Sequence, residues 1–227
     1  MTTVRAVLLL FLCAAATSTG PALAGVIRGQ LELPPVPGAA PRVGDPYAGR
    51  ASSLPQPRVP ARGLPQDAIV YIESIPASVD SLLPPPASQP RLAQRDQSFQ
   101  PRVIAVPVGG YVDFPNMDPI YHSVFSVSPS KRFDLGRYGR GKSKTVRFTK
   151  PGLVNVYCDI HSNMEAFVLV TPNRAVVQAD AAGRYALPDL PPGNYVLLAW
   201  HPDLAPFRRE VTVPRSGDLT LDLSLGR

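Results

Sequence analysis

The sequence predicts an all-β protein. Between residues 91 and 172 it alternates short apolar runs with turn residues, and no run keeps a helical period. Gly109-Gly110 and Pro151-Gly152 are dipeptides that favour chain reversal. Six or more short strands joined in this way are typical of a Greek-key sandwich. The expected strands are Arg102 to Val106, Val108 to Phe114, His122 to Val127, Lys144 to Phe148, Leu153 to Tyr157 and Ala166 to Thr171.

The first 24 residues have the pattern of a secretory signal peptide. Arg5 provides the positive n-region, Val7 to Ala16 the apolar h-region, and Ala22-Leu23-Ala24 a cleavage site before Gly25. A membrane anchor is the alternative, but a span needs about 20 apolar residues and this run is too short. We therefore expect a bacterial protein that is periplasmic or secreted and is not an integral membrane protein.

Cleavage after Ala24 removes Cys13, leaves 203 of the 227 residues and lowers the net charge from +6 to +5. Cys158 is then the single cysteine, so no disulfide can form within the mature chain. A lone thiol in an oxidising compartment is exposed to oxidation unless something occupies it. A bound metal ion would protect it.

Proline-rich sequence precedes most of the expected strands. Fifteen of the 28 prolines lie between Pro34 and Pro101. The run from 34 to 66 favours a polyproline-like loop or linker that adds little to a core, and a similar run extends from Ile75 to Pro90. Between the two, Ala68 to Ile72 has the composition of one strand, which must pair with a distant segment.

Positive charge is concentrated between Lys131 and Lys150. Eight Lys or Arg and one acidic residue, Asp134, give this segment +7, whereas the whole chain carries +6. Such a patch could steer an acidic redox partner or an anionic membrane, with an effect that fades with salt. The alternative is an edge strand that charge protects from aggregation. The segment has no aromatic stacking platform, so we expect no nucleic acid partner.

A soft-metal ligand set lies further along the chain. Cys158, His161 and Met164 place a thiol, an imidazole and a thioether within seven positions. A thiolate with two imidazoles and a weak methionine sulfur suits copper, whereas zinc and hard cations rarely bind a thioether. The second imidazole is expected from His122, which strand-like runs flank on both sides.

Each of these residues also has an ordinary structural interpretation. Cys158 could be a small buried hydrophobe, the two histidines could be structural, and Met164 could fill the core before the apolar run from Ala166 to Thr171. A cysteine nucleophile paired with His161 is another alternative, but no oxyanion-hole or orienting-carboxylate pattern accompanies it.

Three segments together resemble the cupredoxins, the blue copper proteins that include plastocyanin and amicyanin. They are Val112-Asp113-Phe114-Pro115-Asn116, His122-Ser123-Val124, and Tyr157-Cys158 with the C-x2-H-x2-M loop, whose spacing is closest to that of amicyanin. The resemblance implies one type 1 copper ion per chain, bound by His122, Cys158 and His161 as equatorial ligands and by Met164 as the axial ligand. Met117 is a competing sulfur donor with a less suitable spacing.

Asn116, Ser123 and Tyr157 are the expected supporting residues. Asn116 and Ser123 could fix the His122 loop or donate towards the sulfur and so tune the reduction potential, or they could be ordinary loop residues. Because side chains alternate along a strand, Tyr157 should point away from the side that Cys158 faces. The Tyr-Cys pair resembles that of plastocyanin, which implies a second electron route at the surface. Shielding of the sheet face is the alternative.

Apolar residues precede both histidines. Met117, Pro119, Ile120 and Tyr121 come before His122, and Ile160 comes before His161. An apolar end around a metal ligand suits short-lived docking of a redox protein, because a small and weak interface permits rapid release.

The segment from Ala175 to Trp200 resembles a second family. Its Ala182-Gly183 turn, followed by Tyr185 and by Leu190-Pro191-Pro192-Gly193-Asn194-Tyr195, is similar to the carboxypeptidase regulatory-like domain, a transthyretin-type β-sandwich. The resemblance implies that residues 25–73 and 174–224 form one sandwich, with the cupredoxin domain of residues 91–172 inserted in it. Such insertion is tolerated when the entry and exit points are close.

The expected function is that of an exported copper protein that carries single electrons. We expect no enzymatic activity, because four filled ligand positions leave no open site for a substrate. The alternative is a periplasmic copper-binding or copper-delivery protein, or a structural protein of the cell envelope whose metal only stabilises the fold.

Overall fold

The computed structural model describes residues 25–34 and 63–226. The predicted signal peptide, residues 1–24, and most of the proline-rich run from 34 to 66 lie outside the described residues. The described chain is built almost entirely from short strands, with one α-helix and one 3-10 helix, so the predicted all-β fold is confirmed. No helix of the described chain is long and apolar enough to cross a membrane.

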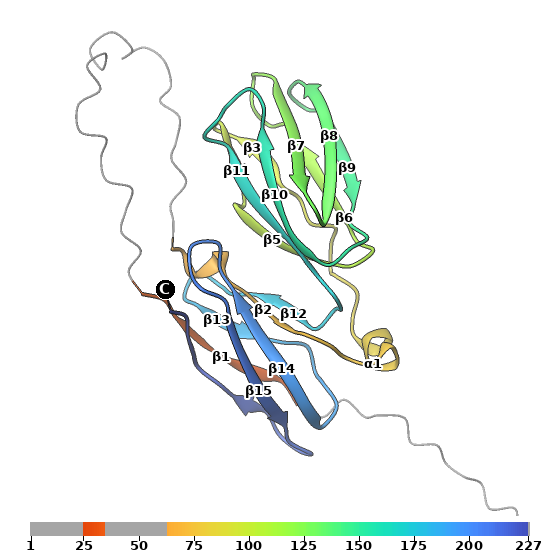
Figure 1. Ribbon diagram of the computed structural model, residues 1–227, viewed down its shortest axis with the longest axis vertical. Coiled ribbons are helices and arrows are strands. Elements are labelled where there is room, and N and C mark those ends of the chain that lie inside the picture. The colour runs from red at the N-terminus through yellow and green to blue at the C-terminus, as the bar shows by residue number, and fades with distance from the viewer. Residues whose placement is uncertain (1–24, 35–62, 227) are drawn as a thin grey trace, which may run out of the picture.

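The upper sandwich in Figure 1, residues 91–171, has a five-stranded sheet that faces a smaller one. The larger sheet has the order β5-β11-β10-β7-β8. The smaller one joins β6 to β9, and the hairpin of β3 and β4 extends it through parallel bridges beside β6. The strands are β3 (Ala93–Arg95), β4 (Ser98–Gln100), β5 (Val103–Pro107), β6 (Tyr111–Pro115), β7 (His122–Ser128), β8 (Lys131–Tyr138), β9 (Ser143–Arg147), β10 (Gly152–Cys158) and β11 (Glu165–Thr171).

Alternation along the central strands decides which side chains face the core. In β10, Val154, Val156 and Cys158 are buried, whereas the residues between them are half-buried. Strand β11 is buried almost throughout, because both of its faces are covered. Its even-numbered residues enter the core of the upper sandwich, and Phe167 and Leu169 enter a second apolar cluster outside it.

The lower sandwich takes its strands from both ends of the described chain. One sheet contains β13-β1-β16, with β17 also paired to β1, and the other has the order β12-β2-β14-β15. A Cβ on Gly29 in β1 would lie 1.9 Å from the carbonyl oxygen of Leu221, so this close approach requires glycine. The strands are β1 (Ile27–Glu32), β2 (Ile69–Ile72), β12 (Val176–Gln178), β13 (Arg184–Ala186), β14 (Gly193–Trp200), β15 (Phe207–Val213), β16 (Leu219–Thr220) and β17 (Leu223–Ser224).

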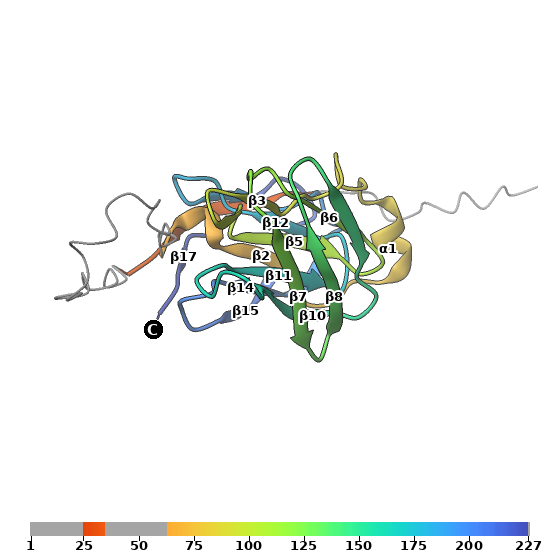
Figure 2. The ribbon, with the colours of Figure 1, turned by 90° about the horizontal axis from the view of Figure 1, so that it is seen from above.

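The two sandwiches pack against each other through an apolar cluster. Ile69 of β2 packs with Val103, Phe167 and Leu169 of the upper sandwich, and Trp200 covers this cluster. The rings of Phe167 and Trp200 meet edge to face with centroids 5.9 Å apart. Figure 2, viewed along the long axis, shows the upper sandwich in front of the lower one. Apolar side chains therefore fill the space between the sandwiches as well as their two cores.

A buried charge cluster lies at one side of this interface. The Arg102 guanidinium donates to both carboxylate oxygens of Asp203, at 2.9 and 3.2 Å, and lies 3.6 Å from a carboxylate oxygen of Asp67. Asp67 belongs to the 3-10 helix η1 (Pro65–Asp67), is 4% exposed, and this oxygen has no hydrogen-bond partner. Burial raises the pKa of Asp67 to about 6, although the nearby Arg102 opposes the shift.

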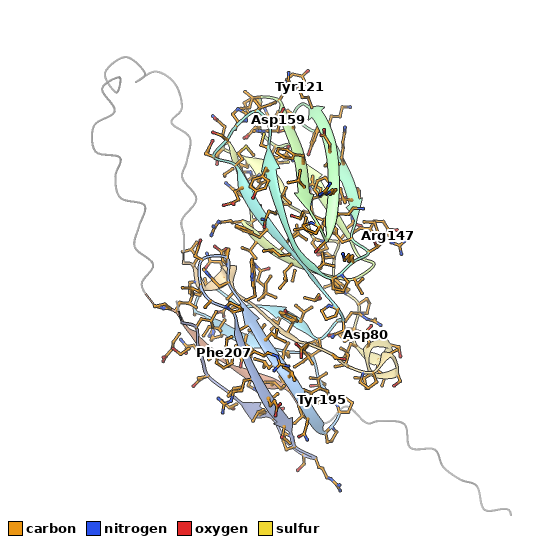
Figure 3. All side chains as sticks on the ribbon, in the orientation of Figure 1. Asp80, Tyr121, Arg147, Asp159, Tyr195 and Phe207 are labelled. Carbon is orange, nitrogen blue, oxygen red and sulfur yellow. The ribbon has the colours of Figure 1, made fainter. Side chains whose placement is uncertain are left out.

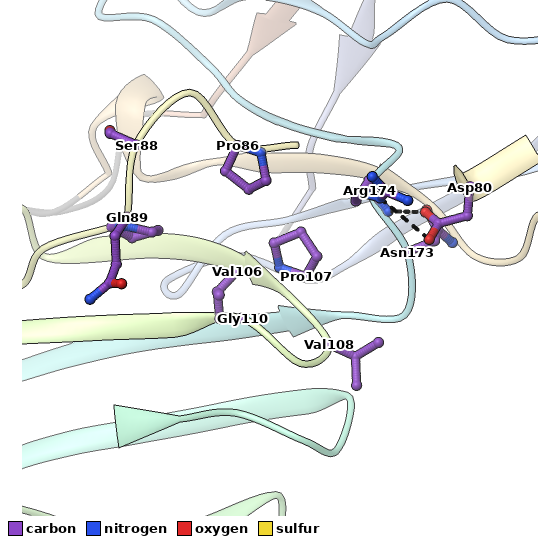
Figure 4. A pocket seen from close by; sticks show the side chains of 11 residues that line it. Asp80, Pro86, Ser88, Gln89, Val106, Pro107, Val108, Gly110, Asn173 and Arg174 are labelled. Atoms are coloured by element: carbon purple, nitrogen blue, oxygen red, sulfur yellow. Dashed lines mark hydrogen bonds and ion pairs between the residues drawn. The ribbon is translucent and has the colours of Figure 1, made fainter. Parts of the chain in front are cut away.

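Helix α1 (Ala77–Leu82) lies in the second proline-rich run, where the sequence predicts a loop. Leu83 after it and Val79 within it are buried in the lower core. Asp80 accepts a hydrogen bond from the backbone N–H of Arg174 at 2.7 Å, and the Arg174 guanidinium donates to the carbonyl of Leu83 at 2.9 Å. The Arg174 guanidinium also forms an ion pair with Asp80 at 3.4 Å, and Figure 4 shows the cavity of about 450 Å³ that both residues line.

The chain enters and leaves the upper sandwich at neighbouring points. Strands β2 and β12, which flank it in the sequence, pair with each other in antiparallel register, with Tyr71 opposite Val176. Asn173, at the exit, donates a side-chain hydrogen bond to the carbonyl of Ile72 at 2.9 Å. The exit is therefore fixed to the strand that precedes the entry.

Three elements of the upper sandwich differ from the sequence prediction. The hairpin of β3 and β4 and strand β8 are not among the expected strands, because their sequences are polar or charged. The strand expected from Val108 begins only at Tyr111, because Gly109 has a φ of +89° and turns the chain.

Replacement of Asp67 by Asn should stabilise the protein above pH 6. The pKa of Asp67 in the folded state, about 6, lies above its ordinary value of 3.8, so its contribution to stability is largest below pH 3.8 and is lost as the pH rises through 6. The variant cannot ionise, and its free energy of unfolding at pH 8 should exceed that of the parent by up to about 3 kcal/mol.

Urea unfolding of the metal-free chain between pH 4 and 8 measures this difference. Asp189→Asn is the matched control, because the Asp189 side chain is exposed. A difference between parent and Asp67→Asn that stays constant with pH would contradict the prediction.

Candidate metal centre

His122 and Cys158 are brought together by the pairing of two neighbouring strands. His122 is the first residue of β7 and Cys158 is the last residue of β10, where it lies opposite Val124. Because the strands are antiparallel, the beginning of one and the end of the other meet at the same end of the sheet. His122 is fully buried, with 0% exposed, and Cys158 is buried as well.

The third donor comes from the loop between β10 and β11. The distance from Cys158 Sγ is 3.7 Å to His122 Nδ1 and 3.8 Å to His161 Nδ1, and the two nitrogen atoms are 3.1 Å apart. One thiol and two imidazoles thus converge with all ligand atoms within 4.8 Å of one another. His161 is half-buried, so it is the donor that lies closest to solvent.

Backbone hydrogen bonds close the loop that holds His161. Cys158 N–H donates to the carbonyl of Met164, Met164 N–H donates to the carbonyl of His161, and Asp159 N–H donates to the carbonyl of Ser123. Met164 is 1% exposed and belongs to the same core cluster as Cys158, whereas Met117 is 41% exposed. Of the two methionines, Met164 is therefore the one buried in the core with Cys158.

These donors fit a copper ion in kind and in spacing. Ligand bonds of about 2.0–2.1 Å to nitrogen and about 2.3 Å to sulfur place two donors on one ion roughly 3–4 Å apart. The three observed separations, from 3.1 to 3.8 Å, lie in this range. A thiolate and two imidazoles with a thioether nearby form a soft donor set, which favours copper over hard cations.

The protein environment prepares the thiol for metal binding. Burial raises the pKa of Cys158, but hydrogen bonds from His122 and from the backbone N–H groups of Ser123, His161 and Ile160 lower it to about 6. Burial also lowers the pKa of His122, and its contacts with Cys158 and Asp118 more than offset this effect, so the pKa is raised. The thiolate, which is the metal-binding form, is therefore favoured at neutral pH.

Asp118 contacts the donor cluster and is not among the residues expected from the sequence. Its carboxylate accepts a hydrogen bond from His122 Nε2 at 2.8 Å, which leaves Nδ1 free to face Cys158 and His161. Burial raises the pKa of Asp118, but hydrogen bonds from Gln97, His122 and Asp96 lower it below its usual range. The carboxylate thereby stays ionised and fixes the ring of His122.

The tip of the β3–β4 hairpin holds this carboxylate in place. The backbone N–H groups of Asp96 and Gln97 donate to the two oxygens of Asp118 at 2.7 and 3.0 Å. Both residues have a positive φ, of 53° and 52°, and this turn directs their N–H groups towards the carboxylate. The only sequence signal for the role of Asp118 is its position four residues before His122. The hairpin tip that holds its carboxylate lies about twenty residues earlier in the chain.

Asn116 organises the loop that leads to His122. Its side-chain amide donates to the carbonyls of Ile120 and Tyr138, each at 2.9 Å, and its Oδ1 accepts from Asp118 N–H at 2.8 Å. Asn116 therefore positions Asp118, which in turn holds His122. The role of Asn116 in fixing the His122 loop stays a prediction.

Ser123 and Tyr157 lie beside the donors and contribute in different ways. Ser123 acts through its backbone, since its N–H donates to Cys158 and its carbonyl accepts from Asp159 N–H. Tyr157 precedes Cys158 and is half-buried on the opposite face of β10. Its ring lies 5.9 Å from that of Phe125 on the paired strand, so it also covers the sheet face.

An apolar surface surrounds the end of the sandwich at which the donors lie. Exposed apolar side chains are unusual when they cluster and are typical of an interaction site. Figure 3 shows Tyr121 and Asp159 at the end of the upper sandwich that points away from the lower one. The exposed members, which we call the apolar end, are Met117, Ile120, Tyr121 and Ile160.

Removal of the Asp118 carboxylate should weaken metal binding without removing a ligand. Asp118→Ala frees the ring of His122 to rotate, so the affinity for copper should fall about 10- to 100-fold. Competition with a chelator measures this affinity. Asp159→Ala, which removes an exposed carboxylate next to Cys158 in the sequence, should bind copper like the parent. Equal affinities of the Asp118 and Asp159 variants would contradict the assigned role.

Comparison with known proteins gives similar solved structures but no sequence match. Neither a protein-family model nor a curated protein matches this chain. A copper-containing nitrite reductase (NirK) from Thermus scotoductus SA-01 is 24% identical with a TM-score of 0.35 over 40% of this chain, which spans only 25% of that enzyme. A purple cupredoxin from Nitrosopumilus maritimus is 24% identical with a TM-score of 0.31 over 33% of this chain and 83% of its own. Amicyanin from Paracoccus versutus is 16% identical with a TM-score of 0.34 over 44% of this chain and 96% of its own.

Proposed function

We propose that this protein is a type 1 copper protein of the cupredoxin kind that accepts and passes on single electrons. The observation that supports this function most directly is the convergence of His122, Cys158 and His161, whose ligand atoms lie within 4.8 Å of one another. Met164 is the proposed fourth ligand. A copper ion bound by this set would supply exchange of one electron between its two oxidation states.

The surroundings of the donors suit a carrier better than an enzyme. His122 is fully buried and held by Asp118, and hydrogen-bonded backbone closes the loop that holds His161. A rigid donor set changes little between two oxidation states, which favours rapid electron exchange. The proposed set of four protein ligands leaves no position for a substrate.

The half-buried His161 offers a short route for electrons to the surface. It follows the exposed Ile160 and lies at the apolar end, where a redox protein could dock closely. A small apolar contact permits rapid release after transfer. Tyr157, on the opposite face of β10, is the proposed second route.

Export to the periplasm or beyond is part of the proposal. It rests on the composition of residues 1–24 and on the single remaining thiol, Cys158, which the metal would protect. N-terminal sequencing of the mature protein from the native cell tests it. A chain that retains Met1 to Ala24 would contradict export by this route.

Titration of the metal-free protein with Cu(II) tests the copper site. Coordination of the Cys158 thiolate should produce an intense visible absorption band and a paramagnetic signal that reduction by one electron removes reversibly. Cys158→Ser should abolish the band. Met164→Leu, a substitution that keeps volume and apolar character, should keep the band and change the reduction potential.

Two results would contradict the proposed function. Tight binding of Cu(I) without a visible band for Cu(II) would indicate copper delivery instead of electron transfer. A band that Cys158→Ser leaves unchanged would show that the metal binds elsewhere.

A further inference from the structure

The basic segment forms one exposed face of the upper sandwich. Of its eight Lys and Arg side chains, only Lys131 is half-buried and the others are exposed. The segment carries +7 in a chain whose total is +6, so the rest of the molecule is close to neutral. We call this surface the basic face. Its residues are Lys131, Arg132, Arg137, Arg140, Lys142, Lys144, Arg147 and Lys150.

Two open strand edges bring these charges together. Strand β8 is the last strand of the five-stranded sheet, and β9 is the last strand of the smaller sheet. The Lys144 ammonium on β9 donates to the carbonyl of Leu135 on β8 and lies 5.4 Å from the centre of the Tyr138 ring. Figure 1 shows the two strands next to each other along one side of the sandwich. The charges therefore lie along one edge of the upper sandwich.

The basic face has no ion pairs, in contrast to five arginines elsewhere in the described residues. Arg28, Arg102, Arg174, Arg184 and Arg208 each form an ion pair with an Asp or Glu. Within the part of the chain that the structure describes, no side chain of the basic face forms one. The only carboxylate on this segment, Asp134, accepts a hydrogen bond from Gly136 N–H. These charges repel one another, and a negatively charged binding partner would reduce that repulsion.

The basic face reaches the apolar end at the turn between β8 and β9. Asn116 N–H donates to the carbonyl of Lys142 at 2.9 Å, and Gly141 N–H donates to the carbonyl of Asn116 at 2.8 Å. Asn116 also bonds to Ile120, and the ring of Tyr121 lies beside Gly139. Arg140 and Lys142 on this turn are therefore next to the apolar side chains that surround the metal donors.

We propose that the basic face and the apolar end form one docking surface for the carboxylate-rich surface of an acidic redox protein. The proposal rests on the proposed function, because an electron carrier needs a partner close to His161. The apolar end would provide the contact through which electrons pass, and the basic face would attract and orient the partner. Four of the eight charges are arginines, whose guanidinium groups bind carboxylates in a bidentate manner.

Binding of poly-L-glutamate to the metal-free full chain tests the surface independently of copper. Chemical shift changes in NMR spectra should map to β8, β9 and the apolar end at low salt, and poly-L-lysine should cause none. The affinity should fall about tenfold or more as the salt concentration rises from roughly 20 to 200 mM.

Charge-reversal variants distinguish the basic face from net charge. Arg140→Glu with Lys142→Glu should weaken poly-L-glutamate binding about tenfold or more. The matched control, Arg209→Glu with Arg215→Glu, reverses two exposed charges on the lower sandwich and should change the affinity less than about twofold. Circular dichroism first establishes that both variants are folded.

Three results would overturn the proposal. An equal loss of affinity in both double variants would show that net charge alone determines binding. Unchanged binding by the Arg140 and Lys142 variant, accompanied by its aggregation, would show that the charges only protect the strand edges. Sedimentation of the parent with phosphatidylglycerol vesicles at about 150 mM salt, in a buffer in which poly-L-glutamate does not bind, would indicate that the partner is a membrane surface. If poly-L-glutamate binds as expected and no visible copper band forms, the docking surface stands and the proposed function fails.

Discussion

The antiparallel pairing of β7 with β10 is the constraint on which the candidate metal centre depends. It places Cys158 opposite Val124 and so brings its sulfur to within 3.7 Å of the ring of His122. The strands are fixed by the apolar core below them, and the donors therefore occupy positions that the core dictates. The loop to β11 then has only to supply His161, and its backbone hydrogen bonds hold that ring 3.1 Å from the first. Strand pairing and the loop to β11 together thus bring the three donors to one place.

A second set of contacts fixes the orientation of the His122 ring. Asp118 holds His122 from behind, Asn116 holds Asp118, and the tip of the β3–β4 hairpin donates to the same carboxylate. The β3–β4 hairpin has little apolar sequence, and its backbone contributes to the site through these hydrogen bonds. The same Asn116 links the site to the turn between β8 and β9. The site and the basic face are thus supported by one group of hydrogen bonds.

The sequence predicts the all-β class and the candidate metal donors better than it predicts the residues that hold those donors in place. The spacing of Cys158, His161 and Met164 is local, and soft-metal chemistry restricts what such a set can bind. Asp118 could not be assigned, because its role depends on a hairpin tip that lies distant in the chain and on two residues with positive φ. Strand β8 was hidden by its charges, since an edge strand buries few side chains and shows no apolar alternation. Helix α1 was hidden by flanking prolines and by its length of six residues.

The neighbouring entry and exit of the upper sandwich affect how the whole chain can fold. Strands β2 and β12 pair although more than one hundred residues separate them, and closure of a flexible loop of that length costs conformational entropy. Once the upper sandwich has folded, the bond from Asn173 to the carbonyl of Ile72 joins two points that are already close. A folded upper sandwich thereby holds β2 and β12 close together, and their pairing closes no long flexible loop.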